Sequence, residues 1–523
     1  MMNKAIFKGI YFHIPFCDNI CSYCDFNKMY YNEKLANDYL EALNIEYQSY
    51  NINTDYVESL YIGGGSPSSL NEKQLKRLFD IINPKQYKNL KEFTIEINPE
   101  SFNKDKAEIL KQYNINRVSI GVQTFNDVLL KLINRQHTKT QVINCISILR
   151  ENKIDNISID LMYGLEKQTA KDIINDLEIV KDLAIKHISA YSLIIEENSI
   201  LYKQNYHKDE DLDYELEMLL HQELLKQGFE HYEVSNYSKN QKYSKHNLLY
   251  WSSQPYLGIG LGAGSYDKEK RWYNTKSITN YNKNKYNREI ELLDSIEKKI
   301  SDDIIVQFRI FNGINLDYFM IEYNIDFQKR FKNVIIKHRD KLYIKNNILY
   351  FTKQGQEFLN DIILAFIKEI EEWAQMEYKN PELIVDSLRA QGYRITRARE
   401  DIIKVLCNVK HYTVEELVTE LKKIKDGVNV ATVYNNLNFL VAEGIVNEYN
   451  FNNKNSVYEL NIGLHAHLIC IDCNDVINLE IPEFMQVKDR VEKETQFDVI
   501  DAKLDMFGHC KKCIDEKALE NSK

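Results

Sequence analysis

The feature that most restricts the fold of this chain is an alternation of short apolar runs with longer amphipathic stretches over its first 200 residues. Segments between the runs, such as 33–50 and 72–82, repeat apolar residues at helical spacing. Strands separated by helices predict a parallel sheet, either open or curled into a partial barrel. The six runs that we interpret as strands are 9–14, 57–63, 92–97, 117–123, 156–162 and 187–194.

Polar and glycine residues follow several of these predicted strands. In parallel α/β folds the chemistry is concentrated at the carboxyl ends of the strands. Those ends carry Cys17, residues 63–66 (Gly-Gly-Gly-Ser), Glu96, Gln123 and Asp160. We therefore expect one site at this edge of the sheet.

The composition indicates a globular protein with several domains. The chain has 523 residues, of which 44% are hydrophobic, and its 18 glycines and 7 prolines are too few for a collagen-like or low-complexity chain. No apolar run approaches the roughly 18 residues of a spanning helix. Lys8 interrupts the first apolar run before a signal peptide could form. We expect a cytoplasmic protein without a membrane span.

The charge is unevenly distributed. The net charge of −10 argues against a general coat for nucleic acids. Residues 376–427 nevertheless carry 10 basic and 9 acidic side chains, whereas residues 443–523 carry 9 and 16. If the chain has a DNA-facing surface, the charge distribution places it in the first of these segments.

Seven of the nine cysteines fall into close groups, at Cys17/Cys21/Cys24, Cys470/Cys473 and Cys510/Cys513. In a cytosolic protein, cysteines at metal-ligand spacing indicate metal sites rather than disulfides. Cys145 and Cys407 stand alone and are expected to be small buried apolar residues.

The first group, Cys17-x₃-Cys21-x₂-Cys24, lies in a loop just after the first predicted strand. Three thiolates suit an iron–sulfur cluster, which normally takes four, so one iron would stay open for another ligand. The alternatives are a zinc site with a distant fourth ligand, or reactive thiols.

These residues resemble the radical SAM superfamily, in which S-adenosylmethionine occupies the open iron of a [4Fe–4S] cluster. The motifs YFHIPFCDNICSYCDF, YIGGGSPSSL, TIEINPES, RVSIGVQTFND, ISIDLMYGL and HISAYSL stand in family order. They are similar to the branch that contains oxygen-independent coproporphyrinogen dehydrogenases and HemW haem chaperones, over residues 5–367. The resemblance implies that Cys17, Cys21 and Cys24 ligate the cluster. It implies that S-adenosylmethionine is contacted by Tyr11, Gly64, Glu96, Gln123, Arg135 and Asp160.

The chemistry of these residue types agrees with the implied roles. Consecutive glycines at 63–65 let the backbone approach a ligand closely, and Glu96 and Asp160 can accept hydrogen bonds from ribose hydroxyls or an amino group. Taken singly, each has a structural interpretation, because glycines form turns and acids at strand ends cap helices.

Two features favour a chaperone over a dehydrogenase. The dehydrogenases carry a further cysteine two residues after the third, and this chain has Phe26 there. Residues 246–251, His-Asn-Leu-Leu-Tyr-Trp, match the HNxxYW motif of HemW, which makes His246 a candidate axial haem ligand. A structural hydrogen-bonding histidine is the alternative. Ser66 and the sequence GLEKQT at 164–169 depart from the family pattern.

The C-terminal cysteines form two Cys-x₂-Cys knuckles separated by 36 residues, which suits a structural zinc site of four thiolates. A dithiol redox motif is the alternative. Just upstream, His465 and His467 lie two apart on a strand-like run, so that both imidazoles share a face. Glu459 and His411 complete a donor set for iron, manganese or zinc.

The segment VNVATVYNNLNFLVAEGIV suggests a recognition helix, whose polar positions include Thr432, Tyr434 and Asn435. Arg394, Arg397 and Arg399 precede the previous helix and could hold phosphates. An ordinary solvated helix face is the alternative.

These C-terminal residues resemble the Fur superfamily of dimeric metal-dependent repressors over about 376–515. The resemblance implies structural zinc at the four cysteines. It implies regulatory Fe²⁺, Mn²⁺ or Zn²⁺ at His411, Glu459, His465 and His467. Asn478 occupies the remaining carboxylate position of the family, with Glu480 two residues on.

Together the two resemblances predict an α/β fusion. A radical SAM core, folded as a partial (β/α)₆ barrel, and a HemW-specific region would together occupy residues 1–300, and a small winged-helix-like tail would occupy 301–367. After a linker at 368–380 we expect a winged-helix DNA-binding domain at 381–450 and an α/β zinc-binding dimerisation domain at 451–523. The expected partners are haem, a haem-accepting client protein, operator DNA and a second copy of the chain, with peripheral membrane contact only through the client.

Three alternatives stay open. In the first alternative, the N-terminal part of the chain is a coproporphyrinogen III dehydrogenase. In the second, it is a haem or iron sensor with a purely regulatory role. In the third, two neighbouring genes have been joined, with Met376 as the start of the second.

Overall fold

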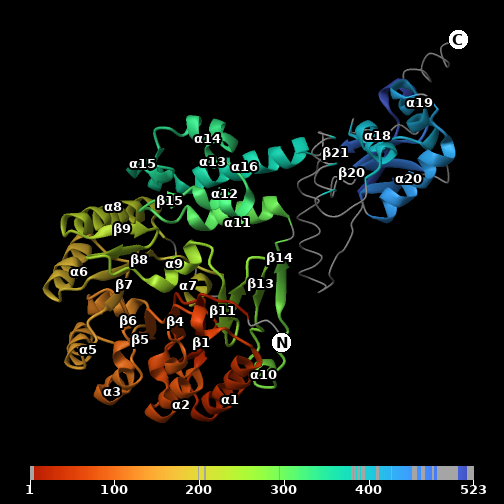
Figure 1. Cartoon of the computed structure of the whole chain (residues 1–523). Helices are drawn as coiled ribbons and strands as arrows, with labels where there is room; N and C mark the ends of the chain where they lie inside the picture. Colours follow the sequence, from red (N-terminus) through yellow and green to blue (C-terminus); the bar gives the residue numbers. More distant parts are fainter. Residues whose placement is uncertain are drawn as a thin grey trace. The chain divides into compact units, whose positions relative to one another are not determined.

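The computed structural model divides the chain into two compact units, residues 1–367 and 368–523 (Figure 1), and each is described by itself. The structure describes residues 5–197, 199–204, 206, 208–293, 295–377, 381, 385, 389, 395–407, 411–425, 427–443, 445–449, 456–460, 466–473, 476–479 and 504–514. Side chains of residues 371–377 and 478 are outside this description. Within the described residues, no helix combines the length and the apolar character needed to cross a membrane.

The core of unit 1 is a curved sheet whose middle strands are all parallel. The strand order is β14-β13-β12-β11-β1-β4-β5-β6-β7-β8-β10-β9. The six predicted strands are confirmed, with ends shifted by one or two residues in three of them. They are β1 (Gly9–Ile14), β4 (Ser59–Gly64), β5 (Glu92–Ile97), β6 (Arg117–Gln123), β7 (Ile157–Tyr163) and β8 (His187–Ser192). A seventh parallel strand, β11 (Tyr256–Ile259), pairs with β1.

Helices cover the convex side of this sheet, as Figure 1 shows. They begin at capping residues: Asn71 and Gln74 form a reciprocal capping box at the start of α2, and Thr138 and Gln141 do so at α5. The helices of this part of the chain are α1 (Glu33–Ser49), α2 (Glu72–Ile82), α3 (Lys104–Gln112), α4 (Asp127–Leu132), α5 (Lys139–Glu151), α6 (Ala170–Asp182), α7 (Ile200–Lys203) and α8 (Glu210–Lys226), and the short α7 contacts the cysteine loop instead of the outer layer. The apolar faces of α1, α2, α3, α5, α6 and α8 form one continuous core with the strands, whereas Leu129 of α4 and Leu201 of α7 belong to a smaller cluster.

Antiparallel strands extend the sheet at both edges. On one side follow β12 (Gly264–Tyr266), β13 (Lys270–Tyr273) and β14 (Glu289–Leu292), and on the other β10 (Asn236–Ser238) and β9 (Glu230–Glu233). The short helices α9 (Lys245–Trp251) and α10 (Ile278–Tyr281) lie between them in sequence. The pair β2 (Phe16–Cys17) and β3 (Met29–Tyr30) frames the N-terminal cysteine loop.

The glycine-rich segment 258–266 is packed tightly against the N-terminal part of the unit. Gly260 has φ +113°, and a Cβ there would lie 2.6 Å from the Tyr39 hydroxyl and 2.8 Å from the carbonyl oxygen of His13. The buried carboxylate of Glu46 in α1 accepts hydrogen bonds from Gly260 N (2.9 Å) and the Tyr281 hydroxyl (2.6 Å). It also accepts one from the amide of Asn274 (2.7 Å). These contacts fix the segment as a structural element of the first unit.

Unit 1 ends in a small helical subdomain with a three-stranded sheet of order β15-β17-β16. Phe308, Phe327, Phe331 and Phe366 fill its core. The elements are α11 (Ile296–Gln307), β15 (Ile314–Asn315), α12 (Asp317–Tyr323), α13 (Phe327–Arg330), α14 (Lys332–Lys337), β16 (Leu342–Lys345), β17 (Ile348–Phe351), α15 (Lys353–Glu357) and α16 (Leu359–Glu377). Helices followed by a hairpin are the arrangement expected of a winged-helix-like tail.

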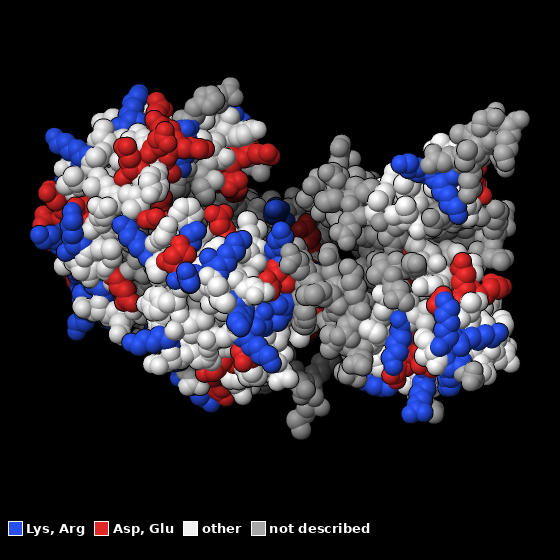
Figure 2. Space-filling model, turned by 90° about the horizontal axis from the view of Figure 1, so that it is seen from above, with Lys and Arg blue, Asp and Glu red and all other residues white. Residues whose placement is uncertain are grey.

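Among its described residues, unit 2 has helices α18, α19 and α20 around a second core, followed by two small sheets. The helices are α18 (Arg397–Leu406), α19 (Val414–Ile424) and α20 (Val430–Ala442). The strands are β18 (Val446–Tyr449), β19 (Val457–Leu460), β20 (Ala466–Cys470), β21 (Val476–Leu479) and β22 (Leu504–Gly508). The predicted recognition helix corresponds to α20, and the predicted strand-like run that carries His467 corresponds to β20. Lys and Arg side chains gather on the face of this unit seen in Figure 2.

Candidate functional site

A cavity of about 490 Å³ opens at the carboxyl ends of the parallel strands in unit 1. Its volume falls within the roughly 300–1,000 Å³ usual for small-molecule and cofactor sites. The structure thus gathers residues that are up to 179 positions apart in the sequence, from Cys17 to Glu196. Among the residues that line it are Cys17, Cys21, Cys24, Gly64, Glu96, Gln123, Arg135 and Asp160.

The cysteine loop is held in place by the strand ends around it. His13 Nε2 lies 2.8 Å from the carbonyl oxygen of Asn27, and Tyr31 N donates to the carbonyl of Cys17 at 2.9 Å. Burial raises the pKa of the Cys17 thiol to about 12 and also raises that of Cys24. Enclosed thiols of this kind need a bound cation to become thiolates, so the donor set fits an iron–sulfur cluster.

The three glycines at 63–65 form a cradle that any side chain would fill. A Cβ on Gly63 would lie 2.7 Å from the Glu96 carboxyl carbon, and a Cβ on Gly65 would lie 3.0 Å from Cys17 Sγ. Gly64 has φ +118°, a conformation that favours glycine. The backbone of β4 can therefore pass close to a ligand between the cysteines and Glu96.

Two carboxyl groups, those of Glu96 and Asp160, line the cavity. Glu96 accepts hydrogen bonds from the Tyr61 hydroxyl (2.7 Å) and Gly64 N (3.0 Å), and desolvation raises its pKa to about 7. Asp160 accepts from Ser119 Oγ at 3.2 Å, and desolvation raises its pKa to about 6. Both retain acceptor capacity for hydroxyl or ammonium groups of a ligand.

The guanidinium group of Arg135 also lines this cavity. Its Nη1 donates to Asn98 Oδ1 (2.8 Å) and its Nη2 to the Tyr23 hydroxyl (3.2 Å), whereas its buried Nε has no hydrogen-bond partner among the described residues. Asn98 also lines the cavity and was missed at the sequence level. It directly follows the predicted strand 92–97, so the strand-end rule could have found it.

Tyr11 is not among the residues that line this cavity. It lies within β1, and its hydroxyl is 3.0 Å from His13 Nδ1. Its predicted contact with S-adenosylmethionine stays a prediction.

His246 lies at the opposite end of the same strands. It is 1% exposed, its Nδ1 is 2.9 Å from the hydroxyl of Ser59 at the start of β4, and its Nε2 is 2.8 Å from the Tyr250 hydroxyl. Burial lowers its pKa to about 3, so the imidazole is neutral near pH 7. A neutral imidazole is the form that binds iron, but both nitrogens have partners in this conformation.

The helix that carries His246 is anchored by residues that the sequence did not single out. The Glu92 carboxylate accepts from Lys245 N and His246 N, each at 3.0 Å. Gly9 makes room for the helix, since a Cβ there would lie 2.9 Å from Leu249 Cδ1. The imidazole of His246 is also 5.0 Å, centroid to centroid, from the ring of Tyr61, whose hydroxyl reaches Glu96.

The four C-terminal cysteines converge in unit 2. The Sγ atoms of Cys470, Cys473, Cys510 and Cys513 lie within 4.8 Å of one another. Cys473 Sγ and Cys510 Sγ are 3.7 Å apart, close to the edge of about 3.8 Å of a tetrahedron with Zn–S bonds of about 2.3 Å. Cys510 N donates to Cys470 Sγ at 3.2 Å, which favours a thiolate. The donor set fits a structural zinc ion.

A second group of donors consists of His411, Glu459 and His467, all within 4.8 Å of one another and almost fully buried. The bridge between Tyr412 and Tyr458 brings His411 beside Glu459. His411 Nε2 lies 3.1 Å from Glu459 Oε2, and His467 Nε2 lies 3.6 Å from Glu459 Oε1. Two imidazoles and a carboxylate fit Fe²⁺, Mn²⁺ or Zn²⁺. His465, predicted as a further ligand, and Glu480 lie outside the described residues.

Helix α20 presents the predicted DNA-reading residues to solvent. Thr432, Tyr434 and Asn435 are exposed on it. Tyr434 and Asn435 border an open groove of about 620 Å³ that also includes Glu448 and Tyr458 of the β18–β19 hairpin.

Two of the predicted phosphate-binding arginines, Arg397 and Arg399, lie in the first turn of α18 rather than before it, and they differ in their surroundings. Arg397 is exposed, whereas Arg399 donates from Nε to Asn436 Oδ1 at 3.2 Å and lies 3.3 Å over the Phe439 ring. Arg399 is thus held by α20, and Arg397 is the freer contact for a phosphate. Arg394 lies outside the described residues.

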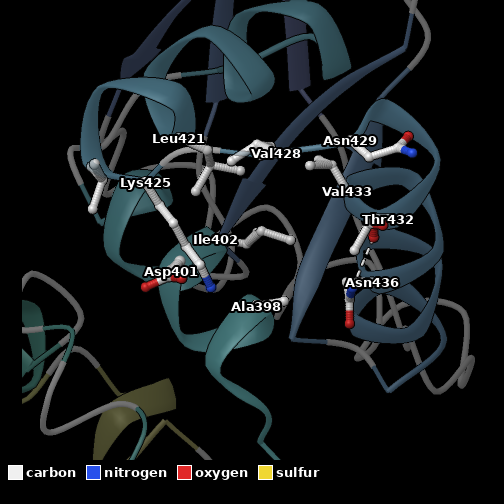
Figure 3. A pocket seen from close by; sticks show the side chains of 12 residues that line it. Ala398, Asp401, Ile402, Leu421, Lys425, Val428, Asn429, Thr432, Val433 and Asn436 are labelled. Atoms are coloured by element: carbon white, nitrogen blue, oxygen red, sulfur yellow. Dashed lines mark hydrogen bonds between the residues drawn. The ribbon is translucent and has the colours of Figure 1, made fainter.

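A small cavity of about 110 Å³ lies between α18, α19 and α20 (Figure 3). Ile402, Leu421 and Val433 point into it, while Asn436 Nδ2 donates along α20 to the carbonyl of Thr432 at 2.8 Å. This volume is below that of ordinary ligand sites, and we assign no ligand to it.

Comparisons with known proteins match each unit to a family. The radical SAM superfamily model matches residues 11–180, and the ferric uptake regulator family model matches residues 390–507. The chain is 34% identical over 378 residues to the haem chaperone HemW of Bacillus subtilis, covering 69% of this chain and 100% of the relative. It is 34% identical over 373 residues to HemW of Lactococcus lactis, covering 69% of this chain and 97% of that one.

A solved structure supports the fold of unit 1. The coproporphyrinogen III oxidase HemN of Escherichia coli, described as a radical SAM enzyme, superimposes with a TM-score of 0.59 at 21% identity. The match covers 69% of this chain and 90% of that one.

Proposed function

Because this chain belongs to the HemW family of radical SAM proteins and carries a ferric uptake regulator family domain, we propose that it binds and delivers haem and also represses transcription in a metal-dependent way. The observation that carries the haem assignment is the full-length match to haem chaperones at 34% identity. Phe26, at the position of the dehydrogenases' additional cysteine, supports a chaperone over a dehydrogenase.

The cavity at the strand ends would hold the cofactors of unit 1. Cys17, Cys21 and Cys24 would ligate a [4Fe–4S] cluster, whose open iron would bind S-adenosylmethionine. Glu96 and Asp160 would accept hydrogen bonds from that ligand, and the glycines at 63–65 would let it lie against the backbone. Arg135 would orient it through the guanidinium, which Asn98 and Tyr23 hold in place.

Haem would bind through His246. Because this imidazole is buried and both of its nitrogens have partners, the side chain must first be released. The Nε2 atom of His246 must first lose the Tyr250 hydroxyl, and the ring must leave its enclosed position. We therefore propose that α9 moves away from the amino ends of β1, β4 and β5 when haem is captured. The captured haem would then be passed to a client protein.

An anaerobic haemin titration of the cluster-reconstituted chain, followed in the Soret band, tests this assignment. We expect saturable binding near one haem per chain, weakened in His246→Ala. His187→Ala is a matched control, because His187 is also 1% exposed and also lies between a serine (Ser158, 2.7 Å) and a tyrosine hydroxyl (Tyr232, 2.8 Å).

The outcomes separate the candidate functions. Equal loss in both histidine variants would mean that the substitution damages the fold rather than the ligand. Absence of binding in the unsubstituted chain would overturn the chaperone assignment and favour coproporphyrinogen III decarboxylation, which product analysis with reduced cluster would detect.

For unit 2 we propose a homodimer that carries structural zinc at the four cysteines and binds operator DNA when the second site is loaded with Fe²⁺, Mn²⁺ or Zn²⁺. The convergence of His411, Glu459 and His467 supports this assignment. Selection from a pool of random DNA duplexes, performed with each metal and with chelator, should recover a two-fold symmetric sequence only with metal. Recovery of the same sequence without metal would overturn the metal dependence.

The fusion further suggests that haem or iron status controls transcription. Operator affinity of the intact chain should then change when haemin is added. An unchanged affinity would refute this coupling and leave the two activities independent.

A further inference from the structure

One acidic residue beside the proposed regulatory metal site has no role so far. In the sheet β21-β20-β22, His467 on the central strand is paired with Asn478 on one side and Asp505 on the other. Asp505 Oδ1 lies 2.9 Å from His467 Nδ1. The His467 side chain is 2% exposed and that of Asp505 is 28% exposed. The aspartate thus contacts the outer nitrogen of a buried imidazole.

The other nitrogen of His467 faces inward. Its Nε2 is the atom that lies 3.6 Å from the Glu459 carboxylate, and the His411 ring is 5.1 Å away at an interplanar angle of 75°. An imidazole whose Nδ1–H donates to a carboxylate keeps its lone pair on Nε2. The arrangement therefore directs the lone pair of His467 toward His411 and Glu459.

We propose that Asp505 is a positioning residue for the metal bound by unit 2. It fixes the tautomer and the orientation of His467, and it makes that imidazole a stronger donor. Asp505 on β22 also provides a negative charge next to His467. Asn478, which is paired with His467 from β21, is neutral and provides none. This inference rests on the proposed metal binding at His411, Glu459 and His467.

The expected size of the effect follows from the chemistry of such pairs. Loss of a carboxylate that holds a metal-binding imidazole typically weakens metal affinity by about 10- to 100-fold. The carboxyamide of Asn at position 505 can still accept from Nδ1–H but carries no charge, so Asp505→Asn should lose less than Asp505→Ala. Asp505→Glu restores the charge and should recover part of the affinity.

The test uses the full chain with its cysteine site loaded with zinc. Affinity for Co²⁺, Fe²⁺ and Zn²⁺ is measured by anaerobic competition with a chromophoric chelator. Asp401→Asn serves as a control, because it removes a carboxylate from α18 of the same unit, outside the donor group. In metal-free protein, ¹⁵N shifts of His467 report which ring nitrogen carries the proton, a property that general destabilisation would not alter.

The results distinguish this inference from the function on which it rests. If the unsubstituted chain binds none of these metals at a second site, the proposed metal binding fails. If it binds metal, but Asp505→Ala and Asp505→Asn bind within twofold of it and keep the Nδ1–H tautomer, the role of Asp505 is refuted. A 10- to 100-fold loss in Asp505→Ala with a changed tautomer, a smaller loss in Asp505→Asn and none in Asp401→Asn supports it.

Discussion

The closed environment of His246 makes a prediction of unusual direction: removing a hydrogen bond should strengthen ligand binding. In the described conformation the Tyr250 hydroxyl lies 2.8 Å from Nε2, the nitrogen that haem iron would need. Tyr250→Phe removes this hydroxyl and leaves the ring in place. The closed state loses a partner for a buried nitrogen, whereas the haem-bound state loses nothing.

The magnitude follows from the net worth of one hydrogen bond. Such a bond contributes about 0.5–1.5 kcal/mol, so its loss shifts the equilibrium toward the open state by roughly 2- to 13-fold. Because only the open state binds, the apparent haem affinity should rise by the same factor. Ser59→Ala removes the bond to Nδ1, at 2.9 Å, and should act in the same direction.

The assay is the anaerobic Soret titration, with Tyr256→Phe as the control. The ring of Tyr256 packs 4.5 Å from that of Tyr250, but the Tyr256 hydroxyl makes no described hydrogen bond to His246. The control should bind like the unsubstituted chain. Weaker haem binding in Tyr250→Phe would refute the reasoning, since it would mean that the hydroxyl stabilises the bound state.

Three further predictions concern the other groups. Desolvation raises the pKa of Glu96 from 4.5 to about 7. The contribution of this carboxyl group to the stability of the folded state is therefore full below about pH 4.5 and is lost as the pH rises through 7. The unfolding temperature of cofactor-free Glu96→Gln should accordingly depend less on pH between about 5 and 8 than that of the unsubstituted chain. Cys513→Ser should release the structural zinc and lower the unfolding temperature of unit 2, while a retained zinc content by elemental analysis would contradict the four-thiolate site. Arg397→Ala should weaken DNA binding similarly for all sequences and reduce the slope of log affinity against log salt by about one; an unchanged slope would exclude a phosphate contact.

The sequence predicted the strands and the cavity well because both depend on local patterns. Short apolar runs separated by segments of helical periodicity define β1 and β4–β8. The rule that functional residues lie at the carboxyl ends of parallel strands placed Cys17, Glu96 and Asp160 at one edge of the sheet. Their roles as ligands stay predictions, but their proximity is observed.

What the sequence did not reveal depends on contacts between distant segments. Ser59 and Glu92 begin strands and have no distinguishing spacing, and they matter only because α9 docks on them from more than 150 residues away. Asp505 reaches His467 because β22 pairs in parallel with β20, an order that alternation along the chain does not specify. The contact between the Tyr11 hydroxyl and His13 Nδ1 was likewise not predicted, and the implied role of Tyr11 toward S-adenosylmethionine stays a prediction.

The carboxylate of Glu46 also bears on how the protein is made. Its partners Gly260, Asn274 and Tyr281 leave the ribosome more than 200 residues after it. Strand β1 leads into the cysteine loop and pairs with β4 along one edge and with β11 along the other. The pairing with β11 can form only after residues 256–259 have been synthesised. A nascent chain that already contains all three cysteines therefore still has the Glu46 carboxylate without its hydrogen-bond donors and an open sheet edge beside the cysteine loop. The frame around the cysteine loop is therefore complete only after about the first 280 residues have been synthesised, and a chain stopped earlier would present thiols without the contacts that enclose them.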